Sequence, residues 1–236
     1  MLAAWVRIAV VTDSREDVDL LSEAFDKRKV FTLYSSFTTM DVIKKANLDQ
    51  SAAVFINLDD DTQTLIFLLN CRKHFSDQIR FGVVLDRGEL VPTFESAGAS
   101  IVVCKNEMAS KLIASFIFEP EVAKFTEDLI ASAVTDDNFD IQQLQVNESN
   151  PFRGQTYDAT FFEMKKRYDA ILIGLASLQN GTRVLHKTPN DPALTIEVND
   201  YMILIVSGRN ADRIAGDFGV TEGCHDRYEP SALKTG

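Results

Sequence analysis

The sequence is poor in cysteine, glycine and basic residues. Its 236 residues include 3 cysteines and 11 glycines, and 24 Lys and Arg face 35 Asp and Glu, which gives a formal net charge of −11. Cys71, Cys104 and Cys224 form no C-x-x-C pair, so we expect neither a disulfide framework nor a zinc site, and a reducing cytoplasm is the expected compartment. Because a polyanion is bound mainly through Lys and Arg, the acidic balance argues against nucleic acid as a partner.

Long apolar runs are also missing. A helix that crosses a bilayer needs about 20 mostly apolar residues, and the longest apolar runs here, residues 52–56 and 201–206, are far shorter. The apolar stretch at the start of the chain is split by Arg7 and ended by Asp13, and no small-residue cleavage site follows it. We therefore expect no transmembrane segment, so that any action at a membrane passes through another chain or another segment.

The first half of the chain alternates apolar runs with amphipathic stretches. Residues 6–12 are typical of a buried strand, and residues 14–25 of a helix in which Val18, Leu21 and Phe25 recur at 3–4 spacing. Five such strand–helix units with short connections predict right-handed crossovers and one parallel sheet covered on both faces. Ligands of such sheets bind at the carboxyl ends of the strands. Polar and charged residues predicted there are Asp13, Ser35, Ser36, Asn57, Asp59, Asp86 and Lys105.

The second half changes to a β pattern. Pro120 interrupts the last helix of the first half, a helical pattern resumes at residues 122–134, and the polar residues 135–140 indicate a boundary. Beyond it, the dipeptide Asn180-Gly181 favours a hairpin turn. Strands are predicted at residues 141–146, 168–177, 182–186 and 201–207, and a helix at residues 209–218.

The acidic residues at the strand ends have two interpretations. Asp59, Asp60 and Asp61, with Asp86 nearby, could supply oxygen ligands to magnesium or calcium. Alternatively they form a solvated loop that caps the helix starting near residue 62. Asp13 likewise could hold a ribose hydroxyl or cap the first helix.

No catalytic motif stands out. The three histidines, His74, His186 and His225, lie far apart in the sequence and near no serine or cysteine in a nucleophile motif, which argues against a hydrolytic triad. The basic run at residues 165–167 is expected to be a solvated loop, with a contact to an acidic partner as the alternative. No G-x-G-x-x-G follows the first strand.

Several stretches together carry a family resemblance. In the second half they are residues 148–154 (ESNPFRG), 168–175 (YDAILIGL), 188–192 (TPNDP) and 199–208 (NDYMILIVSG). In the first half they are residues 47–62 (NLDQSAAVFINLDDDT), 97–103 (AGASIVV) and 118–130 (FEPEVAKFTEDLI). With these stretches, the chain from about Val6 to Ile214 resembles the regulator-of-potassium-conductance family (RCK, or KTN), the gating domains of potassium channels and of Trk/Ktr-type transport systems.

The resemblance implies an α/β fold with a Rossmann-like parallel-sheet N-lobe, a helical crossover and a smaller β-rich (α+β) C-lobe of the TrkA-C type. The expected N-lobe spans residues 1–119, the crossover residues 120–137, the C-lobe residues 138–216 and a flexible tail residues 217–236.

The nucleotide site of the family is degenerate in this sequence. The match begins at the family's second strand, so its first strand and glycine loop are absent, and Asp13 stands in the place of the ribose-binding acid. Ser35-Ser36 replaces the family's Gly-Asp, and Val84 replaces an arginine. The resemblance leaves Asp13, Ser36 and Asn57 as candidate cofactor-binding residues, and we expect neither NAD nor ATP to bind in the family manner.

A divalent cation is then the remaining candidate ligand. Calcium-gated members would use carboxylates near Asn57, Val84 and Asp86, of which only Asp86 is a carboxylate here. The candidate metal ligands of this sequence are therefore Asp59, Asp61, Asp86 and Glu89, with Asp60 beside them.

The first half also resembles a response-regulator receiver, through residues 7–25, 55–61 and 102–116. In that resemblance Asp13 is a metal-site acid and Lys105 is the conserved-type lysine. Asn57 stands where the phosphoryl-accepting aspartate belongs, and an amide cannot form an acyl phosphate. The alternative function is thus a pseudo-receiver signalling module fused to a β-domain and acting by protein contact, which leaves residues 141–214 unexplained.

The RCK resemblance implies a non-enzymatic, ligand-responsive gating domain at the cytoplasmic face of the membrane. Its implied partner is a potassium channel or transporter subunit, with the pore outside these 236 residues. It also implies homo-oligomers, with dimers formed through residues 107–134 and an octameric gating ring as the larger assembly.

Overall fold

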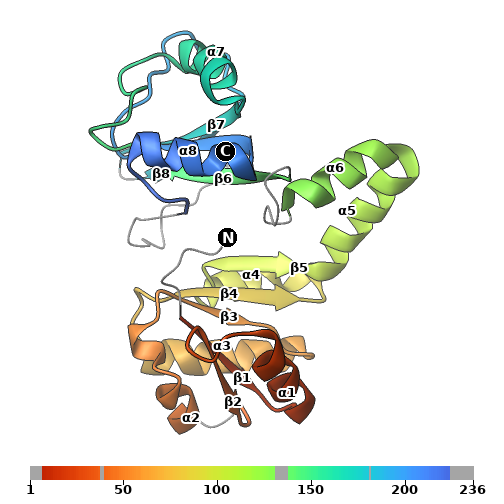
Figure 1. Cartoon of the computed structure of the whole chain (residues 1–236). Helices are drawn as coiled ribbons and strands as arrows, with labels where there is room; N and C mark the ends of the chain where they lie inside the picture. Colours follow the sequence, from red (N-terminus) through yellow and green to blue (C-terminus); the bar gives the residue numbers. More distant parts are fainter. Residues whose placement is uncertain (1–6, 38–39, 131–137, 181, 224–236) are drawn as a thin grey trace. The chain divides into compact units, whose positions relative to one another are not determined.

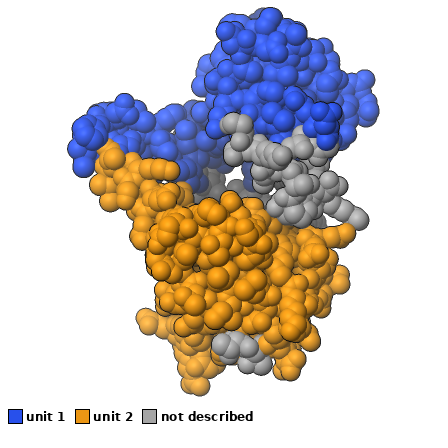
Figure 2. All heavy atoms as spheres, turned by 180° about the vertical axis from the view of Figure 1, so that it is seen from behind, with its two compact units in different colours: residues 1–3, 115–236 blue, residues 4–114 orange. Residues whose placement is uncertain are grey.

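The computed structural model describes residues 7–37, 40–130, 138–180 and 182–223. The chain divides into two compact units, residues 4–114 and residues 115–236 together with 1–3, here called the N-lobe and the C-lobe (Figure 2). Each lobe has its own buried apolar cluster. No helix in the described part of the chain is both long enough and apolar enough to cross a membrane.

The N-lobe consists of parallel strands joined by helices, which confirms the predicted α/β class. Its elements are β1 (Ile8–Thr12), α1 (Arg15–Ala24), β2 (Val30–Tyr34), α2 (Met40–Lys45), η1 (Leu48–Gln50), β3 (Ala53–Ile56), α3 (Asp61–His74), β4 (Arg80–Leu85), η2 (Gly88–Leu90), α4 (Val91–Ser96), β5 (Ile101–Cys104) and the start of α5 (Lys105–Phe118).

Side-chain caps explain where two of these helices begin. The hydroxyl of Ser14 accepts a hydrogen bond from the backbone N–H of Asp17, so Ser14 rather than Asp13 caps α1. The Asp60 carboxylate accepts one from the N–H of Gln63 and caps α3. Each cap satisfies an N–H group that has no partner within its helix. The capping interpretation of the acidic loop is therefore confirmed for Asp60.

The parallel strands form two hydrogen-bonded sheets, where the sequence predicted one. β1 pairs with β2, and β3, β4 and β5 pair in that order, but no ladder joins β1 to β3 in the described part of the chain. In Figure 1, β1 is seen between β2 and β3. Val11 of β1 nevertheless packs against the buried cluster that contains Ile56 and Val83, so one apolar core serves both sheets.

One face of the three-stranded sheet is covered and the other is partly open. Phe81, Val83 and Leu85 of β4 are buried with residues of α3 and α4, and the Arg72 guanidinium of α3 lies 4.5 Å from the ring centroid of Phe81. On the opposite face, Phe55, Gly82 and Ile101 form one cross-strand row. Because Phe55 is 68% exposed and Ile101 51%, the prediction of a sheet covered on both faces is wrong for this row.

The C-lobe is built on an antiparallel sheet, as predicted. Its strands run in the order β6-β9-β7-β8, and its core includes Met164, Leu172, Leu204 and Phe218. Its elements are the end of α5, α6 (Pro120–Ile130), β6 (Phe139–Gln145), α7 (Tyr157–Tyr168), β7 (Ile171–Gln179), β8 (Thr182–Lys187), β9 (Tyr201–Ser207) and α8 (Gly208–Phe218).

Local signals in the second half are mostly confirmed. α5 ends at Phe118 and α6 begins at Pro120, as the proline predicted. Asn180 has a positive φ of 51° between β7 and β8, which suits the predicted hairpin. Residues 131–137, covering the end of the predicted helix and most of the predicted boundary, lie outside the described residues, as does Gly181.

Three expectations for the C-lobe need correction. Tyr168 ends helix α7 and does not begin a strand, and the basic residues 165–167 form the last turn of that helix, where the helix dipole favours positive charge. Residues 217–223 of the predicted flexible tail are held against the C-lobe, because Phe218 is fully buried and the Gly223 N–H donates to the Gln143 carbonyl. Residues 224–236 lie outside the described part.

The break between the two sheets predicts a difference in hydrogen exchange. β4 is paired on both sides, whereas β3 is paired on one side only among the strands that the structure describes. Since alternate amides of a parallel strand point to opposite neighbours, those of β3 that face away from β4 should exchange much faster than the amides of β4. Amide exchange followed by NMR checks this, and uniform protection along β3 would contradict the break.

Candidate functional site

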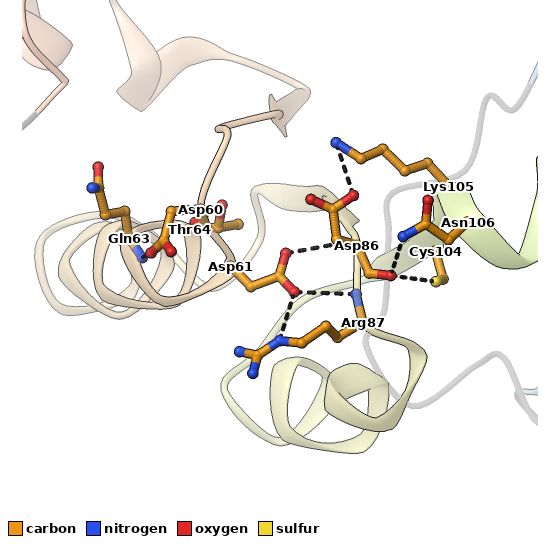
Figure 3. A network of polar contacts seen from close by, with 9 residues as sticks. All are labelled: Asp60, Asp61, Gln63, Thr64, Asp86, Arg87, Cys104, Lys105 and Asn106. Carbon is orange, nitrogen blue, oxygen red and sulfur yellow. Dashed lines mark hydrogen bonds and ion pairs between the residues drawn. The ribbon is translucent and has the colours of Figure 1, made fainter.

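The polar residues at the carboxyl ends of β3, β4 and β5 form a connected network. The centre of it is Asp61, in the first turn of α3, whose side chain is only 7% exposed. Its Oδ1 accepts the N–H of Asp86 at 3.0 Å, and its Oδ2 accepts the N–H of Arg87 at 3.1 Å and the Nε of Arg87 at 3.3 Å (Figure 3). One buried carboxylate thus holds the backbone just after β4 against the start of α3.

These contacts decide the charge state of Asp61. Burial would by itself raise the pKa of this carboxyl, but the two backbone N–H donors and the Arg87 guanidinium outweigh burial and lower the pKa below its usual value of 3.8. Asp61 is therefore an anion at neutral pH and accepts three hydrogen bonds in that form.

Asp86 is held from a second side by the junction of β5 and α5. The Lys105 ammonium lies 3.0 Å from Oδ1 of Asp86, and the carbonyl oxygen of Asp86 accepts from Nδ2 of Asn106 at 2.9 Å and from the Cys104 thiol at 3.4 Å (Figure 3). The hydrogen bond to Asp86, with the negative charges of Asp59 and Asp61, raises the pKa of Lys105. Three consecutive residues therefore converge on one residue of the loop after β4.

The predicted metal ligands are not arranged as one cation site. In the residues that the structure describes, no group of three or more His, Cys, Asp or Glu side chains could hold a metal ion. Asp61 uses both oxygens on N–H donors, and Asp86 is paired with the lysine. Asp59 and Glu89, the other two predicted ligands, do not lie close enough to Asp61 and Asp86 to form a group of three metal-ligating side chains. The sequence did not indicate that backbone N–H groups and a lysine would already bind the carboxylates of Asp61 and Asp86.

The predicted cofactor-binding residues lie at three different strand ends. Asp13 follows β1 and Ser36 follows β2, whereas Asn57 follows β3 in the other sheet. The start of α1 is occupied by the Ser14 cap and carries Glu16 and Asp17 in its first turn. These residues do not fit a pyrophosphate, which binds at a helix start through free N–H groups and is repelled by carboxylates.

One polar pair in the C-lobe escaped the sequence analysis. Ser177 Oγ lies 2.9 Å from Nε2 of His186, and Nε2 of Gln179 lies 3.3 Å from the same ring nitrogen. The register of the hairpin predicted at Asn180 would have placed Ser177 and His186 diagonally across β7 and β8. In the described part of the chain no carboxylate is hydrogen-bonded to His186, so the pair lacks the third member of a hydrolytic triad.

Comparison with known proteins bears on this fold and site. Residues 2–105 match the family model of the TrkA-N domain. This part of the chain is therefore similar to TrkA-N domains. Among curated proteins none matches the sequence significantly.

One of the matched solved structures supports a shared fold. The human SLO3 gating ring aligns with a TM-score of 0.62 at 13% identity, over 88% of this chain and 46% of that one. The GsuK RCK domain aligns over 91% of this chain and 46% of that one at 16% identity, but its TM-score of 0.39 is too low to support an argument. A GsuK channel bound to NAD gives a TM-score of 0.40 at 14% identity, over 92% and 39%. This chain spans less than half the length of these matched chains.

The resemblance to the regulator-of-potassium-conductance family suggests how the strands correspond. In that resemblance β1 and β2 correspond to the family's second and third strands and β3 to its fourth. In the Rossmann order 3-2-1-4-5-6 the first strand lies between the second and the fourth. The unpaired edges of β1 and β3 are the two edges that this strand would join.

The network around Asp61 predicts a pH-dependent loss of stability on mutation. Asp61→Asn leaves one carbonyl oxygen for two partly buried N–H groups, so the free energy of unfolding of the N-lobe should fall by about 1–3 kcal/mol at pH 7. Because the folded pKa of Asp61 lies below its ordinary value of 3.8, the carboxylate contributes fully above that pH and its contribution is lost as the pH falls through the folded pKa.

Urea unfolding at pH 7 and at pH 3 measures both effects. The difference between wild type and Asp61→Asn should shrink at the lower pH. Asp59→Asn, two residues away and exposed, is the matched control and should change the stability little at either pH. An equal effect of both substitutions would contradict the role assigned to Asp61.

Proposed function

We propose that this chain is a regulatory, gating domain of a potassium channel or potassium transport system, placed at the cytoplasmic face of the membrane and acting without catalysis. The observation that carries the proposal is a TrkA-N-like domain joined by an apolar helix pair to a second lobe, in a fold shared with the SLO3 gating ring. Regulation would reach a pore formed by a membrane partner.

The helix pair α5–α6 carries many of the exposed apolar side chains in the described part of the chain. None of the residues of α5 is buried, and Ile113 is 60% exposed, Ile117 70% and Phe118 82%. α6 adds Phe125 at 52% and Ile130 at 70%. Exposed apolar side chains in such number mark a contact with another protein, because they gain free energy only when they leave water.

We assign a second copy of this chain as the partner of this surface. The pair α5–α6 covers most of the region 107–134 for which the sequence predicted dimer formation. Two copies paired through these helices would form the unit from which a ring can be built. A ligand that prefers one arrangement of such a ring shifts it by its difference in affinity for the two arrangements, and that shift would act on the pore.

Substitution on α5 tests the proposed assembly. Ile117→Asp places a charge in the apolar surface, so a dimer seen for wild type at micromolar concentration should become a monomer. Phe162→Asp on α7 is the matched control, because both side chains are 70% exposed, and it should leave the dimer intact. Light scattering coupled to size exclusion measures the mass. A wild-type monomer across the micromolar range would contradict the proposal.

Nucleotide binding has a separate prediction. The acidic first turn of α1 and the absence of a glycine loop lead us to expect no rise of the melting temperature with NAD or ATP. A ligand at 100 times its Kd would stabilise the folded state by about 2.7 kcal/mol, which for a chain of this size corresponds to a rise of several degrees. Thermal-shift titration decides, and a saturable rise with either nucleotide would overturn the expectation.

A further inference from the structure

The start of α5 is fastened to the N-lobe by polar contacts. β5 ends at Cys104 and α5 begins at the next residue, without a loop between them. Of the residues that α5 contributes to the N-lobe, none is buried, so apolar packing gives this helix little support there. The contacts that do hold it, from Cys104, Lys105 and Asn106, all end on Asp86.

The anchor itself is fixed. Asp61 accepts the backbone N–H groups of Asp86 and Arg87 from the opposite side and is buried in the N-lobe. The loop after β4 is therefore gripped between α3 and the first turn of α5 (Figure 3). Glu107 adds to this contact, because its Oε1 would collide with a Cβ placed on Gly88, so the first turn of α5 packs directly on this loop.

The ion pair within this contact is open to competition. The side chains of Lys105 and Asp86 are 49% and 39% exposed, so water and ions reach both. Pairs of this exposure contribute little to overall stability and are weakened by salt. A cavity of about 480 Å³ adjoins Asp86, and its lining also includes Arg87, Glu89, Asn106 and Lys111, which gives solutes access to Asp86.

We propose that Lys105 and Asn106 form a latch on Asp86 that sets the direction in which α5 leaves the N-lobe. The inference rests on the proposed function, in which α5–α6 is the element that pairs with a second copy. A solute that competes for Asp86 or for Lys105 opens the latch and frees the helix to change direction. Lys105 and Asn106 are thus positioning residues that act through the helix they begin.

Spin-label distances between α3 and α5 test the latch. In a Cys224→Ser background, labels at Lys73→Cys and Ala114→Cys, both exposed and both in the N-lobe, report the direction of α5. Samples are diluted with unlabelled chain so that only distances within one copy are measured. Lys105→Met and Asn106→Ala should each broaden the distance distribution, and 1 M NaCl should broaden that of wild type toward that of Lys105→Met.

Two further variants make the result specific. Lys111→Met removes a lysine of the same helix that lines the cavity beside Asp86 but is not the lysine paired with it, and it should leave the distribution narrow. The charge reversal Asp86→Lys with Lys105→Asp should restore the narrow distribution lost in either single variant. The melting temperatures of all variants should stay close to wild type, which separates a change of direction from a loss of folding.

Two results would overturn the latch. One is a Lys105→Met distribution as narrow as that of Lys111→Met, and the other is a charge reversal that leaves the distribution broad. Failure here is distinguishable from failure of the proposed function, because light scattering reads assembly separately. If the wild type is a dimer but Lys105→Met leaves the distance distribution narrow, only the latch is rejected. If the wild type is a monomer, only the proposed assembly is rejected.

Discussion

The carboxylate of Asp61 fixes the end of β4, and the rest of the candidate site depends on that contact. It satisfies two backbone N–H groups that would otherwise lack partners at a buried strand end. Because its ionised form is stabilised by those donors, the loop is held firmly enough for Asp86 to serve as an anchor. Lys105 and Asn106 then attach the first turn of α5 to this anchor. The attachment of α5 to the N-lobe thus depends on the contact between the Asp61 carboxylate and the loop after β4.

The sequence predicted what depends on local patterns and missed what depends on distant partners. Strand–helix alternation, the break at Pro120 and the hairpin at Asn180 follow from periodicity and backbone preference, and they were confirmed. Asp60 and Asp61 are chemically identical neighbours, yet Asp60 caps its own helix, whereas Asp61 turns toward Asp86, a partner 25 residues away in the sequence. The unpaired edge of β3 also involves strands far apart in sequence.

The acidic residues and the exposed apolar residues lie in different parts of the chain and have different roles. Acidic residues gather at helix starts and strand ends, where they cap helices, satisfy backbone N–H groups or pair with lysine. These acidic residues therefore have a structural role in the protein itself. The exposed apolar residues concentrate on α5 and α6, where no such local role exists. The proposed regulatory function combines the two, with a polar site that orients the helix and an apolar surface that assembles copies.

The central claim is that the chain regulates potassium transport through a membrane partner. Purification of the tagged chain from membranes of the cells that naturally produce it, followed by mass spectrometry, tests the claim most directly. We predict that a pore-forming potassium channel or transporter subunit co-purifies in a fixed ratio, and that potassium flux through that protein changes when this chain is removed. Recovery of the chain without any potassium transport protein, together with unchanged potassium flux on its removal, would contradict the account.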